Sequence, residues 1–109
     1  MAWGPAGIEV AFADYLGSTN NLSIARADGS GVRTIAPGAV APDWSPNGRR
    51  IAFQGNRHPD RSGQLLTHLY VIDPRGHDER ILVTDTRSTH VDAPAWAPDS
   101  TRIAFAFTA

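Results

Sequence analysis

A histidine and an aspartate, His90 and Asp92, stand close together in the segment that leads to Trp96. If this segment lines a central channel, the two side chains could hold a metal ion or a polar ligand, because imidazole and carboxylate groups are common ligands for both. Hydrogen bonds that cap a strand are the commoner role for such a pair. We therefore keep His90 and Asp92 as candidate channel-facing residues.

Two other places could carry binding chemistry. Asp43, just before Trp44, could also face a channel; the alternative is a turn carboxylate that accepts backbone N–H bonds. The segment 56–63 concentrates charge on a predicted surface loop, and such loops often bind partners, although a solvated loop is the simpler interpretation. Its candidate interaction residues are Arg57, His58, Asp60 and Arg61.

The remaining polar motifs do not support catalysis. Ser18 and Ser45 have no His–Asp pair at a recognisable spacing, and no G-x-S-x-G motif is present. The run 28–31, Asp-Gly-Ser-Gly, lacks the strand-to-helix context of a phosphate-binding loop and predicts a hairpin turn. With no cysteine in the chain, a thiolate metal site is excluded. We expect no catalytic residue, no metal and no cofactor, and therefore not an enzyme.

Length and charge narrow the class further. The chain has 109 residues, enough for one compact domain, and its 10 Lys and Arg balance 11 Asp and Glu. Without a basic stripe we expect no nucleic-acid partner. No apolar run approaches the ~18 residues of a membrane span, and no export signal is evident. We expect a soluble chain off the membrane, cytoplasmic or, if a signal was removed, periplasmic.

The elements that would position these residues come from an internal repeat. The stretch 41–53, APDWSPNGRRIAF, returns at 93–105 as APAWAPDSTRIAF, and a degenerate third copy begins at Trp3. Aligning the tryptophans Trp3, Trp44 and Trp96 also aligns the segments between them, with the extra length in two polar loops. We expect the repeated aromatic residues to form the core: Trp3, Phe12, Trp44, Phe53, Trp96 and Phe105.

Each repeat predicts strands joined by turns. Ser45-Pro46-Asn47-Gly48 has the residues of a hairpin corner, whereas the third copy places Ser100 where Gly48 stands, which costs about 1 kcal/mol if φ is positive there. Short β-favouring runs flank the corners, and no helical periodicity is sustained. Leu69–Ile72 and Ile51–Phe53 are apolar at successive positions, which predicts burial on both faces of a sheet.

A sheet covered on both faces and repeated roughly every 40–50 residues predicts an all-β fold built of β-propeller blades, each a four-stranded antiparallel sheet. A small β-sandwich is the alternative, but it does not explain the repeat. The pattern P-x-W-S-P-x-G-x-x-I-A-F, followed by L-Y-V-I-D, a glycine turn and R-I-L, resembles the TolB-type (WD40-like) β-propeller repeat over nearly the whole chain. This resemblance implies the blade type and says little about function, because propellers are scaffolds.

The chain accounts for about two and a half blades: blade 1 at about 1–37, blade 2 at about 38–85 and the start of blade 3 at about 91–109. The expected strands, innermost first, are Met1–Trp3, Ile8–Phe12, Leu22–Ala25 and Val32–Ile35, then Val40–Trp44, Arg50–Gly55, Leu69–Asp73 and Arg80–Val83, then Ala93–Trp96 and Arg102–Phe107.

Closed propellers typically need four to eight blades, because each blade covers its neighbours. We therefore expect homo-oligomers that associate through blade faces and C-terminal strands, three chains closing a six-bladed ring in one arrangement. Since Met1–Trp3 is short for an innermost strand, Ala93–Trp96 of another chain is an expected replacement.

Two classes of function remain open. The first is a non-catalytic module for protein interaction or assembly. The second is the propeller of a larger protein, either a prolyl-oligopeptidase or tricorn-like hydrolase or a TolB-like translocation protein of the periplasm, as the resemblance implies. We favour the first.

Overall fold

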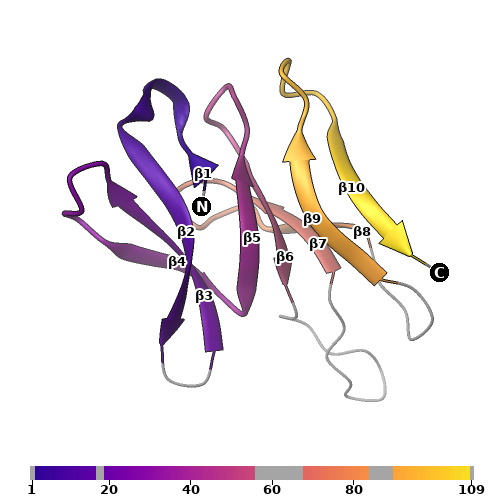
Figure 1. Ribbon diagram of the computed structural model, residues 1–109, viewed down its shortest axis with the longest axis horizontal. Coiled ribbons are helices and arrows are strands. Elements are labelled where there is room, and N and C mark those ends of the chain that lie inside the picture. The colour runs from indigo at the N-terminus through magenta and orange to yellow at the C-terminus, as the bar shows by residue number, and fades with distance from the viewer. Residues whose placement is uncertain (1, 17–18, 56–67, 84–89, 109) are drawn as a thin grey trace.

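The computed structural model describes residues 2–16, 19–55, 68–83 and 90–108. These residues form ten strands and one short 3-10 turn, Pro5–Gly7 (Figure 1). The strands are β1 (Ala2–Trp3), β2 (Glu9–Leu16), β3 (Thr19–Arg26), β4 (Arg33–Pro37), β5 (Ala39–Trp44), β6 (Ile51–Gly55), β7 (His68–Ile72), β8 (Arg80–Val83), β9 (His90–Trp96) and β10 (Ile103–Thr108).

The strands make three antiparallel sheets that stand side by side in chain order (Figure 1). The first two sheets have four strands each, in the orders β1-β2-β3-β4 and β5-β6-β7-β8, and the third pairs β9 with β10. The predicted all-β class and its four-stranded antiparallel sheets are therefore confirmed. Most strand ends differ from the expected ones by a few residues, and β2 runs on to Leu16 because it pairs with β3 along its whole length.

The three copies of the repeated motif adopt one corner geometry. In each copy two backbone hydrogen bonds close the turn: Gly4 to Glu9 and Gly7 to Gly4 in the first, with equivalent pairs starting at Ser45 and Ala97 in the others. The turn requires a positive φ at its last position, which is 65° at Gly7, 78° at Gly48 and 63° at Ser100. Glycine takes this conformation freely, whereas Ser100 holds it against steric repulsion, as the motif predicts.

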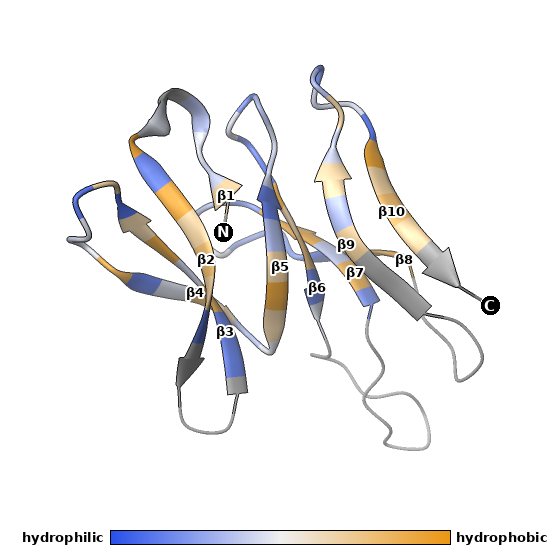
Figure 2. Ribbon diagram, in the orientation of Figure 1, coloured by the Kyte–Doolittle hydropathy of each residue, from blue (hydrophilic) through white to orange (hydrophobic). Residues whose placement is uncertain are grey.

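The two central strands of the middle sheet, β6 and β7, are buried on both faces. All residues of β7 are buried, as are four of the five in β6, in agreement with their uninterrupted apolar sequences. Ile51 and Phe53 of β6 pack with Tyr70 and Ile72 of β7 against Leu22, Ile24 and Ala36 of the first sheet. Figure 2 shows the corresponding hydrophobic bands along the central strands. The core therefore lies between the first and second sheets.

Neighbouring sheets meet closely at their corners. The Trp44 ring lies against Gly4, where a Cβ would stand 3.1 Å from Trp44 Cζ3, and a Cβ at Gly48 would stand only 2.8 Å from Pro5 Cγ. At the outer side, Arg33 of β4 donates to the Pro74 carbonyl oxygen at 3.4 Å. The corner of the first sheet is therefore packed against the tryptophan of the second sheet, Trp44.

The expectation of a common aromatic core is wrong for two of its members. Trp44 and Phe53 are buried, but Trp3 is 56% exposed and Phe105 is 38% exposed. Phe12 and Trp96 are half-buried. The physical reason is position: Trp44 packs on the preceding sheet, while no described residue precedes the first sheet to cover Trp3.

The inner position of the first sheet is filled by the chain's own β1. Ala2 pairs with Ala11 and Trp3 with Val10, so this short strand occupies the innermost place of its own sheet. The replacement by Ala93–Trp96 of another chain stays a prediction. No helix among the described residues is long and apolar enough to cross a membrane.

Candidate functional site

Asp43 lies at the junction between the second and third sheets. Its Oδ2 accepts a hydrogen bond from the backbone N–H of Trp96 at 2.6 Å, and its backbone oxygen accepts one from the Trp96 indole Nε1 at 3.0 Å. The Asp43 carboxylate therefore accepts a hydrogen bond from a backbone N–H group, which was the alternative to a channel-facing role. The bond joins the second sheet to the third and does not lie within a turn.

The same position in the other copies cannot make this contact. Ala2 and Ala95 stand where Asp43 stands, one residue before Trp3 and Trp96. An alanine methyl accepts no hydrogen bond, so the carboxylate link occurs only where Asp43 meets Trp96. The bulge in β5 between Val40 and Asp43 accompanies this arrangement, since a bulge re-aims the residues that follow it.

The other predicted binding residues are only partly described. His90 and Asp92 belong to β9, opposite Thr108 and Ala106, and the positions of their side chains lie outside the description. Arg57, His58, Asp60 and Arg61 all lie outside the described residues. Among the His, Asp and Glu side chains that are described, no group of three comes together as a metal site would require.

A groove of about 350 Å³ opens between the second and third sheets. Apolar side chains line most of it, from β7 and β8 on one side and from β9 and β10 on the other: Leu69, Val71, Leu82, Trp96, Ile103 and Phe105. Such an apolar concavity with a few polar groups is the usual form of a binding site. The sequence analysis did not predict this groove, although the repeated apolar run 103–105 was a signal for an apolar surface.

Two arginines, Arg50 and Arg102, supply the charge of this groove. They occupy equivalent places, each directly before the repeated Ile-Ala-Phe. The Nη1 atom of Arg50 is buried and has no hydrogen-bond partner, and a buried donor left unpaired is unfavourable. No Asp or Glu is among the described residues that line the groove. The site therefore favours an apolar ligand that also carries a negative charge.

The hairpin turn next to the groove is stabilised by a buried carboxylate. Asp73 Oδ1 accepts the backbone N–H groups of Arg75 and His77, each at 2.9 Å, and Oδ2 lies 3.3 Å from the Arg75 guanidinium. The His77 N–H is the largest cause that lowers the pKa of Asp73 below its ordinary value; burial opposes it, and the Arg75 bonds add to the lowering. Asp73 therefore holds the turn that joins β7 to β8.

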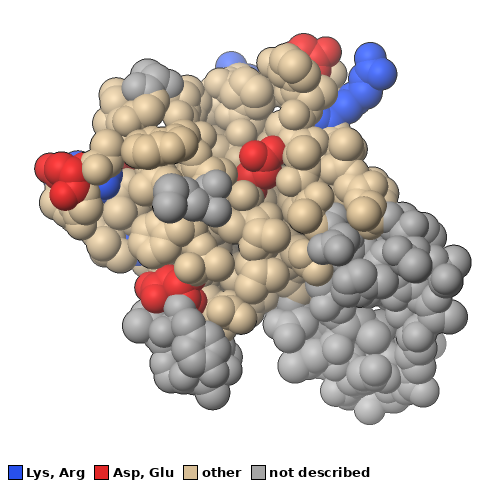
Figure 3. Space-filling view, viewed as in Figure 1, with Lys and Arg blue, Asp and Glu red and all other residues tan. Residues whose placement is uncertain are grey.

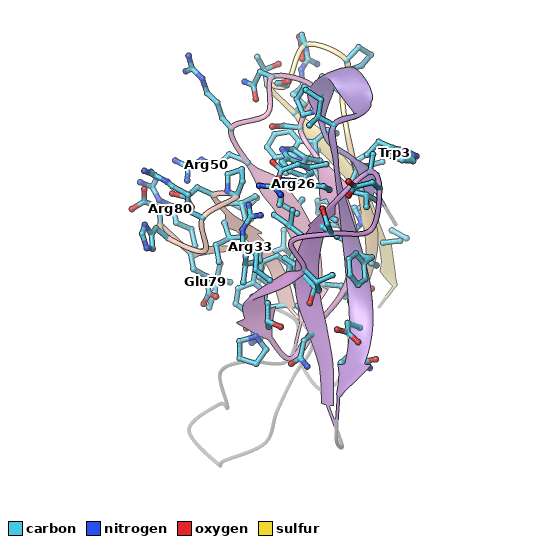
Figure 4. All side chains as sticks on the ribbon, turned by 90° about the vertical axis from the view of Figure 1, so that its left-hand side faces the viewer. Trp3, Arg26, Arg33, Arg50, Glu79 and Arg80 are labelled. Atoms are coloured by element: carbon cyan, nitrogen blue, oxygen red, sulfur yellow. The ribbon has the colours of Figure 1, made fainter. Side chains whose placement is uncertain are left out.

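Charge is unevenly placed around the sheets. Figure 3 shows that the side on which β1, β5 and β9 lie is mostly uncharged. In Figure 4, which looks onto the first sheet, the labelled arginines Arg26, Arg33, Arg50 and Arg80 gather at the outer side with Glu79, while Trp3 projects from the opposite side. Among the described residues, the side on which β1, β5 and β9 lie therefore carries few charges, whereas the opposite side carries these arginines together with acidic partners such as Glu9 for Arg33.

Comparison with known proteins supports the blade assignment. No protein-family model matches the chain. Tol-Pal system protein TolB of Paramagnetospirillum magneticum is 37% identical over 71 residues, which are 62% of this chain and 15% of that protein. The protein of the same name from Zymomonas mobilis is 36% identical over 85 residues, 76% of this chain and 17% of that protein. The chain thus matches only 15–17% of the length of these relatives.

Solved structures show the same fold. A putative TolB from Agrobacterium tumefaciens superposes with a TM-score of 0.79 at 20% identity, over 95% of this chain and 36% of that one. The β-propeller domain of the Trilobed protease from Pyrococcus furiosus superposes with a TM-score of 0.64 at 17% identity, over 89% of this chain and 30% of that one. Identities this low show the fold alone.

Proposed function

We propose that this chain, which belongs to the TolB-type β-propeller repeat family, is a non-catalytic module for protein interaction whose copies associate through their blade faces. The curated relatives are named for the Tol-Pal system, and that name is consistent with a role among several proteins. Binding through a repeated scaffold requires surfaces, not catalytic groups.

The observation that carries the proposal is the exposure of large apolar side chains on the face of the first sheet that points away from the second sheet. Trp3 is 56% exposed and Ile8 is 65% exposed. Their equivalents in the third copy, Trp96 and Thr101, line the groove toward the second sheet, so Trp3 and Ile8 face away from the second sheet. Exposed apolar patches of this kind mark interaction sites.

The chain itself contains the template for such contacts. Trp44 sits on Gly4 of the preceding corner and is nearly fully buried there. A corner that receives Trp3 in the same way would bury it equally well. In the proposed association, the first sheet of one copy stacks on the β9–β10 sheet of another copy, as sheets stack within the chain.

The hydrolase alternative has weaker support. Its propeller likeness, to the Trilobed protease, is at 17% identity and shows the fold alone. Within the described residues the turn carboxylates accept hydrogen bonds from their own turns, as Asp28 does from Ser30 and Asp99 does from Thr101. Such roles are structural.

Multi-angle light scattering across a range of concentrations tests the association. We expect oligomers at micromolar concentration, and about tenfold weaker association for Trp3→Ala, because a large aromatic side chain at an interface centre carries much of the binding energy. Val32→Ala is the matched control, since Val32 is also exposed, at 57%, but lies in the turn between β3 and β4. A wild-type chain that stays monomeric would refute this function.

A further inference from the structure

The corner of the second sheet holds the only asparagine of the chain that is followed by glycine, Asn47. Asn47 is exposed, and Gly48 has a φ of 78°. Asparagine is a chemically labile residue, most of all before glycine, because glycine has no Cβ to shield its backbone nitrogen. We propose that Asn47 is a site of spontaneous deamidation that the folded corner keeps closed and that opens when the third sheet moves away from the second.

The reaction needs only the chain and water. The Gly48 backbone nitrogen gives up its proton to solvent and attacks Asn47 Cγ, and the new bond closes a succinimide ring. The bond between Cγ and Nδ2 breaks, and Nδ2 takes up a proton and leaves as ammonia. A water molecule then opens the ring: hydrolysis at Cγ gives aspartate, and hydrolysis at the Asn47 backbone carbonyl gives isoaspartate. Nothing is oxidised or reduced.

The corner holds both reacting groups away from this path. The Gly48 N–H donates to the Ser45 backbone oxygen at 2.9 Å, and a hydrogen-bonded amide loses its proton more slowly than a free one. Asn47 Oδ1 accepts two hydrogen bonds, from the Ser45 hydroxyl at 2.8 Å and from the Arg49 backbone N–H at 3.0 Å. These bonds fix the side-chain amide, so the attack requires the turn to open first.

Neighbouring corners keep this turn closed. On one side Pro5 lies so near to Gly48 that a Cβ there would stand 2.8 Å from Pro5 Cγ. On the other side the Asn47 backbone N–H donates to the Ser100 hydroxyl at 3.0 Å. The Ser100 contact belongs to the junction of the second and third sheets, where two further hydrogen bonds lie. Separation of the sheets at this junction therefore frees the residue that reacts.

The corner accepts one of the two products better than the other. The third corner has an aspartate, Asp99, at the place of Asn47. Its Oδ1 accepts the Thr101 backbone N–H at 3.0 Å, just as Asn47 Oδ1 accepts the Arg49 N–H. An aspartate at position 47 would therefore keep the turn and add a negative charge. Isoaspartate lengthens the backbone by one carbon, which a turn packed against Pro5 cannot absorb, so its formation would leave the corner open.

The test compares deamidation of the folded full chain with that of the chain unfolded in guanidinium chloride, at the same mildly alkaline pH. Peptide mapping by mass spectrometry follows each asparagine, and enzymatic methylation of isoaspartate distinguishes the two products. We expect Asn47 to react first in the unfolded chain and at least about tenfold more slowly in the folded chain, because the rate then follows local opening. Asn20 and Asn21 precede larger side chains and are internal controls that should react more slowly than Asn47 when unfolded.

Ser100→Ala tests the link to the third sheet. It removes the acceptor of the Asn47 N–H and should speed deamidation of the folded chain several-fold. Thr101→Ala is the matched control, because the Thr101 hydroxyl lies in the same corner but donates to Asp99 of its own turn; it should leave the rate unchanged. Equal rates in the folded and unfolded chain, an unmodified Asn47 in the unfolded chain, or equal rates for the two variants would overturn the inference.

Asn47→Asp separates the effects of the two products. We expect this variant to unfold at the wild-type temperature and the purified isoaspartate form to unfold at a lower one, since only isoaspartate breaks the turn. An isoaspartate form as stable as the variant would overturn the proposed opening of the corner.

Discussion

Asp43 and Trp96 are joined across two sheets by two hydrogen bonds, one from the Trp96 backbone N–H to Oδ2 at 2.6 Å and one from the indole Nε1 to the Asp43 backbone oxygen at 3.0 Å. The first needs the carboxylate, whereas the second needs only the main chain. Substitution of Asp43 therefore separates the two contacts.

Asp43→Ala should lower the free energy of unfolding by about 1–3 kcal/mol, because the Trp96 N–H loses a charged acceptor in a partly buried place. Hydrogen exchange of the Trp96 amide should accelerate, which locates the effect. Asp28→Ala is the control, since Asp28 accepts only from Ser30 in its own exposed turn. Unchanged exchange at Trp96 would show that the carboxylate does not hold the third sheet.

Gly48→Ala tests the contact between successive corners. The added Cβ meets two obstacles: a φ of 78° and the Pro5 Cγ at 2.8 Å. Gly7→Ala meets only the first, since its φ is 65° and nothing lies within 4 Å. Chemical denaturation should show a loss of about 1–2 kcal/mol for Gly7→Ala from the backbone alone, and a larger loss for Gly48→Ala. Equal losses would mean that the Pro5 contact is unimportant.

Ser100 has a strained backbone conformation and a hydroxyl group that accepts a hydrogen bond. Its φ is 63°, and its Oγ accepts the Asn47 N–H at 3.0 Å. Ser100→Ala loses the acceptor and keeps the strain, whereas Ser100→Gly loses both. We expect the glycine variant to be more stable than the alanine variant by about 1 kcal/mol in thermal unfolding. The reverse order would show that φ at this corner is not costly.

Asp73 should make stability depend on pH. Because its folded pKa is lowered, chiefly by the His77 N–H, the carboxylate contributes stability that is fully present above its unfolded pKa, near 4, and is lost as pH falls through the folded value. Asp73→Asn keeps an oxygen acceptor for the two backbone N–H groups but loses the charge, so it should cost about 1 kcal/mol at pH 7, and the difference from wild type should shrink below about pH 4. A difference that stays constant down to pH 2 would contradict this role.

Most of the fold follows from local chemistry. The Pro-x-Gly corners predict the turns because proline fixes its own φ and glycine reaches a positive φ without steric cost, and the uninterrupted apolar run Ile51–Phe53 predicts a doubly buried strand. The repeat then predicts sheets that stack. Leu69–Ile72 is an example: it was expected as a buried strand, and β7 is buried throughout.

The binding surfaces were predicted less well. His90 and Asp92 were chosen for their ligand chemistry, whereas the groove with Arg50 and Phe105 was not anticipated. Its lining comes from four strands of two sheets, so no short segment of sequence contains it.

The sequence by itself determined the repeat, the strand and turn positions and the blade type, because each depends on residues close together along the chain. Only the tertiary structure decided which copy of a repeated residue is buried. Trp44 is covered because Gly4 lies beneath it, while the equivalent Trp3 is exposed. Burial depends on the sheet that stacks against a residue, and that sheet is supplied by a different part of the chain or by a partner.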